Sequence, residues 1–133
     1  MKGKKRFTSV VHVIKENLDE LNHVNNVEYL KYLQEAAIQH WYDVATTDEI
    51  DQIRWIAKKH IIEYFKPAFE NDELIITTWI EKYNSISTER HYQIHRGNDL
   101  IVEAQTLWIA LDSGTLKPKR LSKSILAKFD SLF

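Results

Sequence analysis

One short stretch of the chain gathers a carboxylate, an imidazole, three asparagine amides and the start of a helical pattern. It covers residues 19–29 and reads Asp-Glu-Leu-Asn-His-Val-Asn-Asn-Val-Glu-Tyr. Asp19 lies four residues before His23, and a regular apolar spacing begins at Val27. A carboxylate beside the free N–H groups of a helix start supplies a base or nucleophile together with a site for developing negative charge. These residues are suited to acyl transfer to water.

The composition favours one compact domain over residues 1–133. Of the 133 residues, 44% are hydrophobic, which is enough for a single core. The formal net charge of −1 creates no general attraction to nucleic acid or to a membrane surface. The chain has no cysteine, so thiolate nucleophiles and thiolate metal sites are excluded, and no apolar run approaches the ~20 residues of a spanning helix. We expect a cytoplasmic protein with no nucleic-acid or membrane partner.

Hydrophobic spacing predicts one long helix and five strands. The helix should run from Val27 to an end between Ala45 and Thr47, because apolar residues recur there every three or four positions. Strands are expected at 6–15, 55–65, 74–83, 87–95 and 100–111, with short helices at 48–53 and 122–129. The connections between the last three strands are too short for parallel crossovers, so we expect an antiparallel sheet. The long helix is long enough to lie along that sheet.

This order of elements resembles the hot-dog fold, and two motifs extend the resemblance to a family. The stretch Asp19-x-x-x-His23-Val24-Asn25-Asn26-x-x-Tyr29 resembles a loop of the 4-hydroxybenzoyl-CoA thioesterase family and of plant acyl-carrier-protein thioesterases. The stretches 63–68 and 71–74 resemble the strand and turn of the same superfamily. The resemblance implies an α+β fold with a five-stranded antiparallel sheet around one helix. It also implies an acyl-CoA thioesterase without metal or organic cofactor, assembled as a homodimer or homotetramer with active sites at subunit junctions.

The same resemblance suggests three catalytic candidates. Asp19 matches the catalytic carboxylate, His23 matches the histidine of the plant loop, and Glu63 matches a catalytic glutamate of the plant enzymes. The chain departs from the plant pattern at Leu21, where those enzymes have asparagine, and Asn22 could take over part of that polar role. Asp19 could attack a thioester carbonyl or remove a proton from water.

Each catalytic candidate also has a plain structural alternative. Asp19 could close the loop through an Asx turn, and His23 could be a satisfied core group. Glu63 would be desolvated if it points inward and a solvated strand residue if it points outward.

The start of the helix is expected to serve catalysis through its backbone. Asn25 followed by Glu28 is a capping-box pattern that would fix the first turn. A fixed first turn would aim the N–H groups of Val24, Asn25, Asn26 and Val27 at one point, as an oxyanion site. Tyr29 is either a core residue or part of the substrate channel.

The coenzyme A phosphates would need cationic partners at the protein surface. Lys117, Lys119 and Arg120 follow the last strand, and Arg90 on the fourth strand is another candidate; all four could also be ordinary solvated charges. The acyl pocket is expected between helix and sheet, and the candidates for packing there or for limiting acyl chain length are Trp41, Trp55, Trp79 and Phe65.

Two classes of function remain open on these residues. One is acyl-CoA hydrolysis through Asp19, or hydrolysis of an acyl group carried by acyl-carrier protein. The other is a catalytically silent module that binds acyl-CoA or acyl-carrier protein. Metal chemistry is disfavoured, because His91 and His95 on one strand would lie ~13 Å apart. Three glycines and no Gly-x-Ser-x-Gly motif exclude nucleotide-loop and serine-hydrolase sites.

Overall fold

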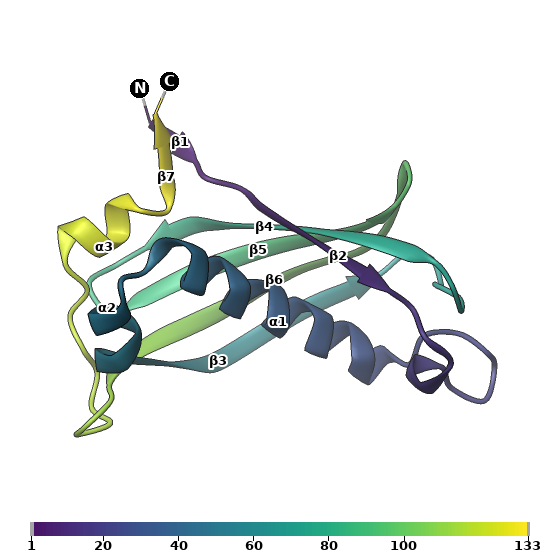
Figure 1. Ribbon diagram of the computed structural model, residues 1–133, viewed down its shortest axis with the longest axis horizontal. Helices are drawn as coiled ribbons and strands as arrows, with labels where there is room; N and C mark the ends of the chain where they lie inside the picture. Colours follow the sequence, from purple (N-terminus) through teal and green to yellow (C-terminus); the bar gives the residue numbers. More distant parts are fainter. Residues whose placement is uncertain (1, 133) are drawn as a thin grey trace.

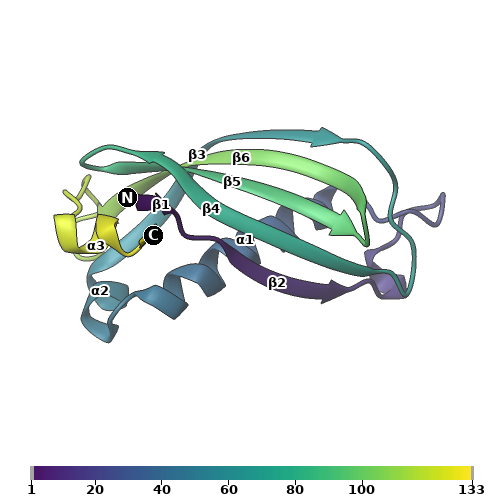
Figure 2. The same ribbon diagram turned by 90° about the horizontal axis from the view of Figure 1, so that it is seen from above.

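The computed structural model describes residues 2–132, and its main feature is a curved antiparallel sheet wrapped around one long helix. The sheet has the strand order β2-β4-β5-β6-β3. Its strands are β2 (Phe7–His12), β3 (Ile53–Tyr64), β4 (Glu73–Tyr83), β5 (Ser87–Arg96) and β6 (Asp99–Asp112). Helix α1 (Asn26–Val44) lies along the concave face of this sheet (Figures 1 and 2). The expected hot-dog architecture is confirmed.

Short elements close the two ends of the molecule. They are β1 (Lys2–Lys4), the 3-10 turn η1 (Lys15–Asn17), α2 (Thr47–Gln52), α3 (Lys123–Ala127) and β7 (Asp130–Leu132). Strands β1 and β7 pair antiparallel beside α3 (Figure 1). Helix α2 begins with a complete capping box, in which Thr46 Oγ1 accepts from the Glu49 N–H at 3.1 Å and Glu49 Oε1 accepts from the Thr46 N–H at 2.9 Å. This box fixes the chain direction between α1 and β3.

Helix α1 buries the stripe that its apolar spacing predicts. The buried residues are Tyr29, Tyr32, Leu33, Ala36, Ala37, His40 and Trp41. Asn25 is the N-cap, as expected, and its Oδ1 accepts from the Val27 N–H at 3.2 Å. The expected capping box with Glu28 is wrong, because the Asn25 N–H already donates to the Asn17 carbonyl at 2.9 Å. Glu28 instead accepts from Asn17 Nδ2 at 3.3 Å and from Lys31 Nζ at 3.4 Å.

The core has two parts, one under each half of α1. The first lies under the N-terminal half and includes Leu33, Ile76, Tyr92, Ile94 and Val102. The second lies under the C-terminal end of α1 and surrounds Trp41. Its other buried residues come from β3, β4, β6, α3 and the residues next to α3, and they are Ile53, Ile80, Ala110, Leu121, Ile125 and Phe129. Each core part adjoins a different end of the molecule.

The register of the sheet places the functional segments at opposite ends. Ile53 pairs with Asp112 at one end of the β3–β6 ladder, and Tyr64 pairs with Val102 at the other. The loop of residues 13–25 lies near the Tyr64 end, whereas α2, α3 and the loop of residues 113–122 lie near the Ile53 end (Figure 1). At ~3.3 Å per residue these ends are separated by about 36 Å.

Within residues 2–132, no helix combines the length and the apolar character needed to cross a membrane.

Candidate functional site

Asp19 organises the loop that precedes α1. Its N–H donates to the His23 carbonyl at 2.8 Å, and its carbonyl accepts from the Asn22 N–H at 3.0 Å. Its Oδ1 accepts from the N–H groups of Leu21 at 2.9 Å and His23 at 3.2 Å. Asn22 has a φ of 61°, a left-handed conformation that asparagine tolerates in turns. The Asx-turn alternative is therefore present, and it orients the carboxylate.

The Asp19 carboxylate lines a cavity of about 260 Å³, which we call the loop cavity. Its walls are Asp19, His23, Val24, Asn26, Tyr29, Tyr64, Phe65, Lys66 and Pro67. Oδ2 of Asp19 has no hydrogen-bond partner among residues 2–132, so one carboxylate oxygen is held and the other is available to a ligand. Tyr64 and Lys66 were missing from the sequence-based set, since nothing in their spacing distinguishes them from other strand-end residues.

The four N–H groups expected to form an oxyanion site do not meet at one point. The Val24 N–H donates to the Ala68 carbonyl at 2.9 Å, and the Asn25 N–H donates to the Asn17 carbonyl. The Val27 N–H is taken by the N-cap. The Asn26 N–H has no acceptor in the described part of the chain, and Asn26 lines the loop cavity. The expected donor set is thus reduced to one amide.

His23 and Tyr29 contribute to the walls of the loop cavity. The His23 ring is half-buried and meets the Phe69 ring edge-on, with 5.3 Å between the centroids. The Tyr29 side chain is buried, and its hydroxyl accepts from the Ala68 N–H at 3.1 Å. Burial raises the pKa of Tyr29 above its ordinary value, so the hydroxyl stays protonated at neutral pH. The core interpretation of Tyr29 is confirmed, while its substrate contact stays a prediction.

Glu63 does not join Asp19. Glu63 is exposed and pairs with Glu103 on the neighbouring strand. The preceding residue, Ile62, is half-buried and packs against the core, so Glu63 lies on the outer face of β3. The inward, desolvated alternative is wrong in this chain. The sequence could not decide the face, because both alternating sets of β3 contain apolar residues.

The predicted basic residues also lie away from Asp19. Lys117 and Arg120 are exposed, and Lys119 Nζ lies 3.7 Å from Asp112 Oδ2, at the Ile53 end of the sheet. Within one chain, this basic loop and the loop cavity are therefore at opposite ends (Figure 1).

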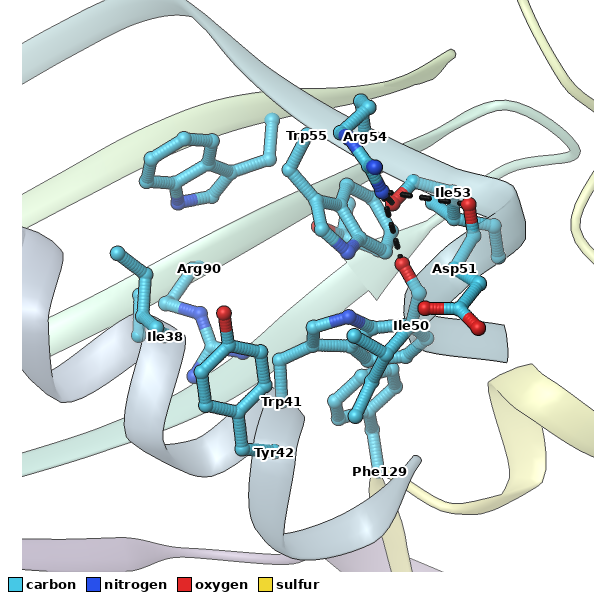
Figure 3. Close-up of a pocket in the computed structure, with 13 residues that line it drawn as sticks. Ile38, Trp41, Tyr42, Ile50, Asp51, Ile53, Arg54, Trp55, Arg90 and Phe129 are labelled. Atoms are coloured by element: carbon cyan, nitrogen blue, oxygen red, sulfur yellow. Dashed lines mark hydrogen bonds between the residues drawn. The ribbon is translucent and has the colours of Figure 1, made fainter. Parts of the chain in front are cut away.

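A second cavity of about 330 Å³ lies under the C-terminal end of α1, and we call it the aromatic cavity (Figure 3). Its lining includes Trp41 and Trp55, as predicted for the acyl pocket, together with Trp108. The remaining walls are Ala37, Ile38, Tyr42, Ile50, Asp51, Ile53, Arg54, Thr88, Arg90 and Phe129. The other two predicted wall residues lie elsewhere.

Trp79 and Phe65 have different environments from those predicted. The Arg6 guanidinium lies over the Trp79 ring, with 3.9 Å between Arg6 Cζ and the ring centroid. The Trp79 Nε1 donates to Glu81 Oε2 at 2.7 Å. Phe65 lines the loop cavity instead of the aromatic cavity. Of the four residues proposed for the acyl pocket, Trp41 and Trp55 thus line the aromatic cavity, and the binding of an acyl group there stays a prediction.

Arg90 is buried rather than at the surface, so the expected surface contact with coenzyme A phosphates is wrong. It is 4% exposed and lies on the inner face of β5. Its Nη1 donates to His40 Nδ1 at 2.9 Å and to Thr78 Oγ1 at 3.1 Å. The alternation of Arg90 with Tyr92 and Ile94 indicates this inward position already in the sequence.

His40, on the buried side of α1, is neutral. Burial, with the positive charges of Arg90 and Lys5 adding to it, lowers the pKa of His40 to about 3. Its Nδ1 can therefore accept from Arg90, while its Nε2 is buried with no partner in the described residues. Burial lowers the pKa of Arg90 to about 10, so the guanidinium keeps its charge at neutral pH. The stripe that contains Leu33 and Ala37 also contains His40, a pattern the sequence already shows.

Comparison with known proteins places the chain in a family. A model described as "Thioesterase-like superfamily" matches residues 13–129. The acyl-CoA thioester hydrolase YbgC of Escherichia coli is 28% identical over 129 residues, covering 92% of this chain and 95% of YbgC.

Solved structures agree with this match. The probable thioesterase YbaW of Escherichia coli is 25% identical with a TM-score of 0.76, covering 91% of this chain and 94% of YbaW. The Staphylococcus aureus protein SAV2348, solved in complex with CoA, shares the fold with a TM-score of 0.83 at 13% identity, covering 95% of this chain and 82% of SAV2348. The family model, which spans α1 and strands β3 to β6, shows that the chain belongs to the thioesterase-like superfamily.

Proposed function

We propose that this protein hydrolyses acyl-CoA thioesters in the loop cavity, with Asp19 as nucleophile or general base. The observation that carries the proposal is that Asp19, with one unpaired carboxylate oxygen, and Asn26, whose N–H has no acceptor in the described residues, line one cavity at the start of α1. The name of the relative YbgC supports an acyl-CoA substrate, and the CoA bound to SAV2348 supports a coenzyme A site on this fold.

Two routes use the same residues. In the first, the Asp19 carboxylate bonds to the acyl carbon and the CoA thiolate leaves; water then hydrolyses the mixed anhydride and restores the carboxylate. In the second, Asp19 takes a proton from water, the resulting hydroxide adds to the acyl carbon, and the thiolate leaves and is protonated. Both routes place negative charge on the carbonyl oxygen, where the Asn26 N–H and the positive end of α1 would stabilise it.

The site is proposed to be shared between two copies of the chain. Strand β3 is an edge of the sheet, and its outer edge offers unpaired backbone groups. A two-fold axis across β3 would pair it antiparallel with the β3 of a second copy and bring the Ile53 end of one chain to the Tyr64 end of the other. The basic loop of one chain would then approach the loop cavity of its partner. This arrangement supports phosphate contacts by Lys117, Lys119 and Arg120.

A panel of acyl-CoA thioesters tests the proposed function, with release of free thiol as the readout. Asp19→Asn keeps the size of the side chain and removes the charge, so the rate should fall by about 100-fold or more. Glu20→Gln is the matched control, because Glu20 is an exposed carboxylate of the same loop and lies outside the cavity lining. Its rate should equal that of the unmodified protein.

Three outcomes separate the alternatives. Loss of activity in Asp19→Asn alone supports the enzyme. Binding of acyl-CoA with no hydrolysis by any panel member, unaffected by Asp19→Asn, would overturn it in favour of a silent binding module. Faster hydrolysis of the same acyl group on acyl-carrier protein would identify the carrier protein as the preferred donor.

A further inference from the structure

The charge of Arg90 has no counter-ion. No carboxylate of residues 2–132 lies within ion-pair distance of its guanidinium, although seven ion pairs are formed elsewhere in the same residues. Its two acceptors, His40 and Thr78, are neutral. An uncompensated buried cation is costly, because the low-dielectric interior replaces water only partly. A protein retains such a charge most readily where something else pairs with it.

The unpaired part of the guanidinium adjoins the aromatic cavity. Both hydrogen bonds of Arg90 use Nη1, and no acceptor in the described residues pairs with Nε or Nη2. Arg90 lines the aromatic cavity (Figure 3), which has room for a ligand at the lower end of small-molecule sites. Trp55, on the wall from β3, also has a buried Nε1 with no acceptor. Arg90 is thus a lining residue whose guanidinium keeps unpaired N–H groups, while the Trp55 Nε1 is enclosed within the wall.

The rest of the cavity is suited to the hydrocarbon part of a ligand. Its walls include the rings of Trp41, Trp55 and Trp108 and the side chains of Ile38 and Ile53. Access is past α1, where Ile38 is 47% exposed and Tyr42 is 60% exposed. A ligand that enters here meets apolar surface first and the cation at the inner wall. The group that Arg90 recognises would therefore be at the end of the ligand that lies deepest in the cavity.

We propose that the aromatic cavity selects acyl groups that end in a carboxylate, with Arg90 as the residue that binds it. This inference rests on the proposed hydrolysis of acyl-CoA and on the proposed dimer, in which the aromatic cavity, at the Ile53 end of one chain, comes to the loop cavity of its partner. It names the substrate class of that shared site. The methylene or aromatic part of the acyl group packs against the tryptophans, and the terminal carboxylate accepts from the free guanidinium N–H groups. Charge-assisted pairing of this kind favours the carboxylate over an uncharged acceptor such as a hydroxyl.

Matched substrates test the selectivity without any mutation. CoA thioesters of equal chain length are compared as kcat/KM, one series ending in a carboxylate, one in a hydroxyl and one in a methyl group. The carboxylate series should exceed the methyl series by about tenfold or more, with the hydroxyl series between them. Equal values for the carboxylate and methyl series, or a preference for methyl, would overturn the proposal.

Variants of Arg90 assign the effect. Arg90→Met has a side chain of similar length without charge, so the ratio of kcat/KM between the carboxylate and methyl series should fall to about one. Arg90→Lys should keep part of the preference and remains informative if Arg90→Met does not fold. Arg6→Met is the control, because Arg6 lies over the Trp79 ring as Arg90 lies over the Phe129 ring, with Cζ 5.9 Å from its centroid, but Arg6 is outside the cavity lining. A drop of all three series together in Arg90→Met would mean that Arg90 is structural.

Binding gives a readout that is independent of turnover. Three tryptophans line the cavity, and Trp79 does not, so a Trp79→Phe background reports the cavity by intrinsic fluorescence. Free dicarboxylates should quench this fluorescence, and their monocarboxylate counterparts should do so more weakly. Quenching by dicarboxylates without hydrolysis of any thioester would refute the proposed function and leave the cavity assignment standing. Hydrolysis that ignores the terminal group would do the reverse.

Discussion

Asn26 occupies the first position of α1, where a backbone N–H has no acceptor inside the helix. This position tolerates proline well, and the preceding Asn25 already has φ −64° and ψ 136°, a conformation compatible with a following proline. Asn26→Pro therefore removes the proposed oxyanion donor and leaves the helix start intact. We expect kcat to fall by about 100-fold with the melting temperature nearly unchanged.

Asn26→Ala is the control for this prediction, because alanine keeps the N–H and removes the amide side chain. Its kcat should stay close to that of the unmodified protein. If Asn26→Pro retained full activity, the Asn26 N–H would have no part in stabilising the oxyanion.

His40 makes a prediction about acid stability. Its pKa is about 3 in the folded protein and about 6.5 when unfolded, so below pH 6.5 the unfolded chain takes up a proton that the folded chain refuses. The free energy of unfolding should therefore fall as the pH drops from about 6.5 towards 3, by up to about 1.4 kcal/mol per pH unit. Urea unfolding at a series of pH values measures this slope.

The slope should be smaller in His40→Gln and unchanged in His12→Gln, since His12 is exposed on β2. Parallel slopes for the unmodified protein and His40→Gln would show that His40 does not control acid stability.

At the scale of single residues, the sequence was most informative where chemistry is local. Asp19, His23 and Asn26 lie in one loop, so their spacing alone brings them to one cavity. Arg90 and His40 lie 50 positions apart, and only the packing of α1 on β5 brings them into contact. Their inward positions could be predicted from the alternation of β5 and the stripe of α1. Their pairing, and the absence of a counter-ion in the described residues, could not.

At the scale of single elements, the N-cap of helix α1 should contribute measurably to the stability of the protein. Asn25→Ala removes the N-cap bond to the Val27 N–H and should lower the free energy of unfolding by about 1 kcal/mol. Glu28→Ala should cost less than this, because Glu28 forms no capping box, its bond from Asn17 Nδ2 is long at 3.3 Å, and Lys31 in its ion pair is mostly exposed. Urea unfolding of both variants at pH 7 makes the comparison. Equal losses would indicate that Glu28 does support the helix start.

The elements themselves were largely predictable from hydrophobic periodicity. The helix expected from Val27 to an end between Ala45 and Thr47 is observed from Asn26 to Val44, and the five strands agree with the observed sheet. The capping box was wrong because the Asn17 carbonyl takes the Asn25 N–H, a contact made by the fold of the loop. The face of Glu63 was unreadable because apolar residues occupy both sides of β3. Periodicity thus defines elements well and their polar contacts poorly.

At the scale of the whole molecule, the proposed dimer predicts that two defective variants restore activity when they form mixed dimers. Asp19→Asn should be inactive, and a variant with Lys117, Lys119 and Arg120 all changed to Glu should lose affinity for CoA. In a shared site, the intact Asp19 of one chain meets the intact basic loop of the other. Mixing the two variants through unfolding and refolding should therefore restore about a quarter of full activity, because half of the dimers are mixed and each has one intact site.

Sedimentation of each preparation checks that dimers have formed. No recovery of activity in mixed dimers would show that the basic loop does not serve the partner's site. Recovery is a property of the assembly alone, since the two segments lie at opposite ends of one chain (Figure 1).

Helix α1 links the two cavities, because its first residue, Asn26, lines the loop cavity and Trp41, near its last turn, lines the aromatic cavity. In the proposed dimer these ends belong to two different active sites. The 19 residues of the helix span about 28 Å, so one continuous element borders both catalytic centres. Changes at Ile38 or Trp41 that re-engineer chain-length preference should therefore be assayed for turnover at the other end of the helix as well.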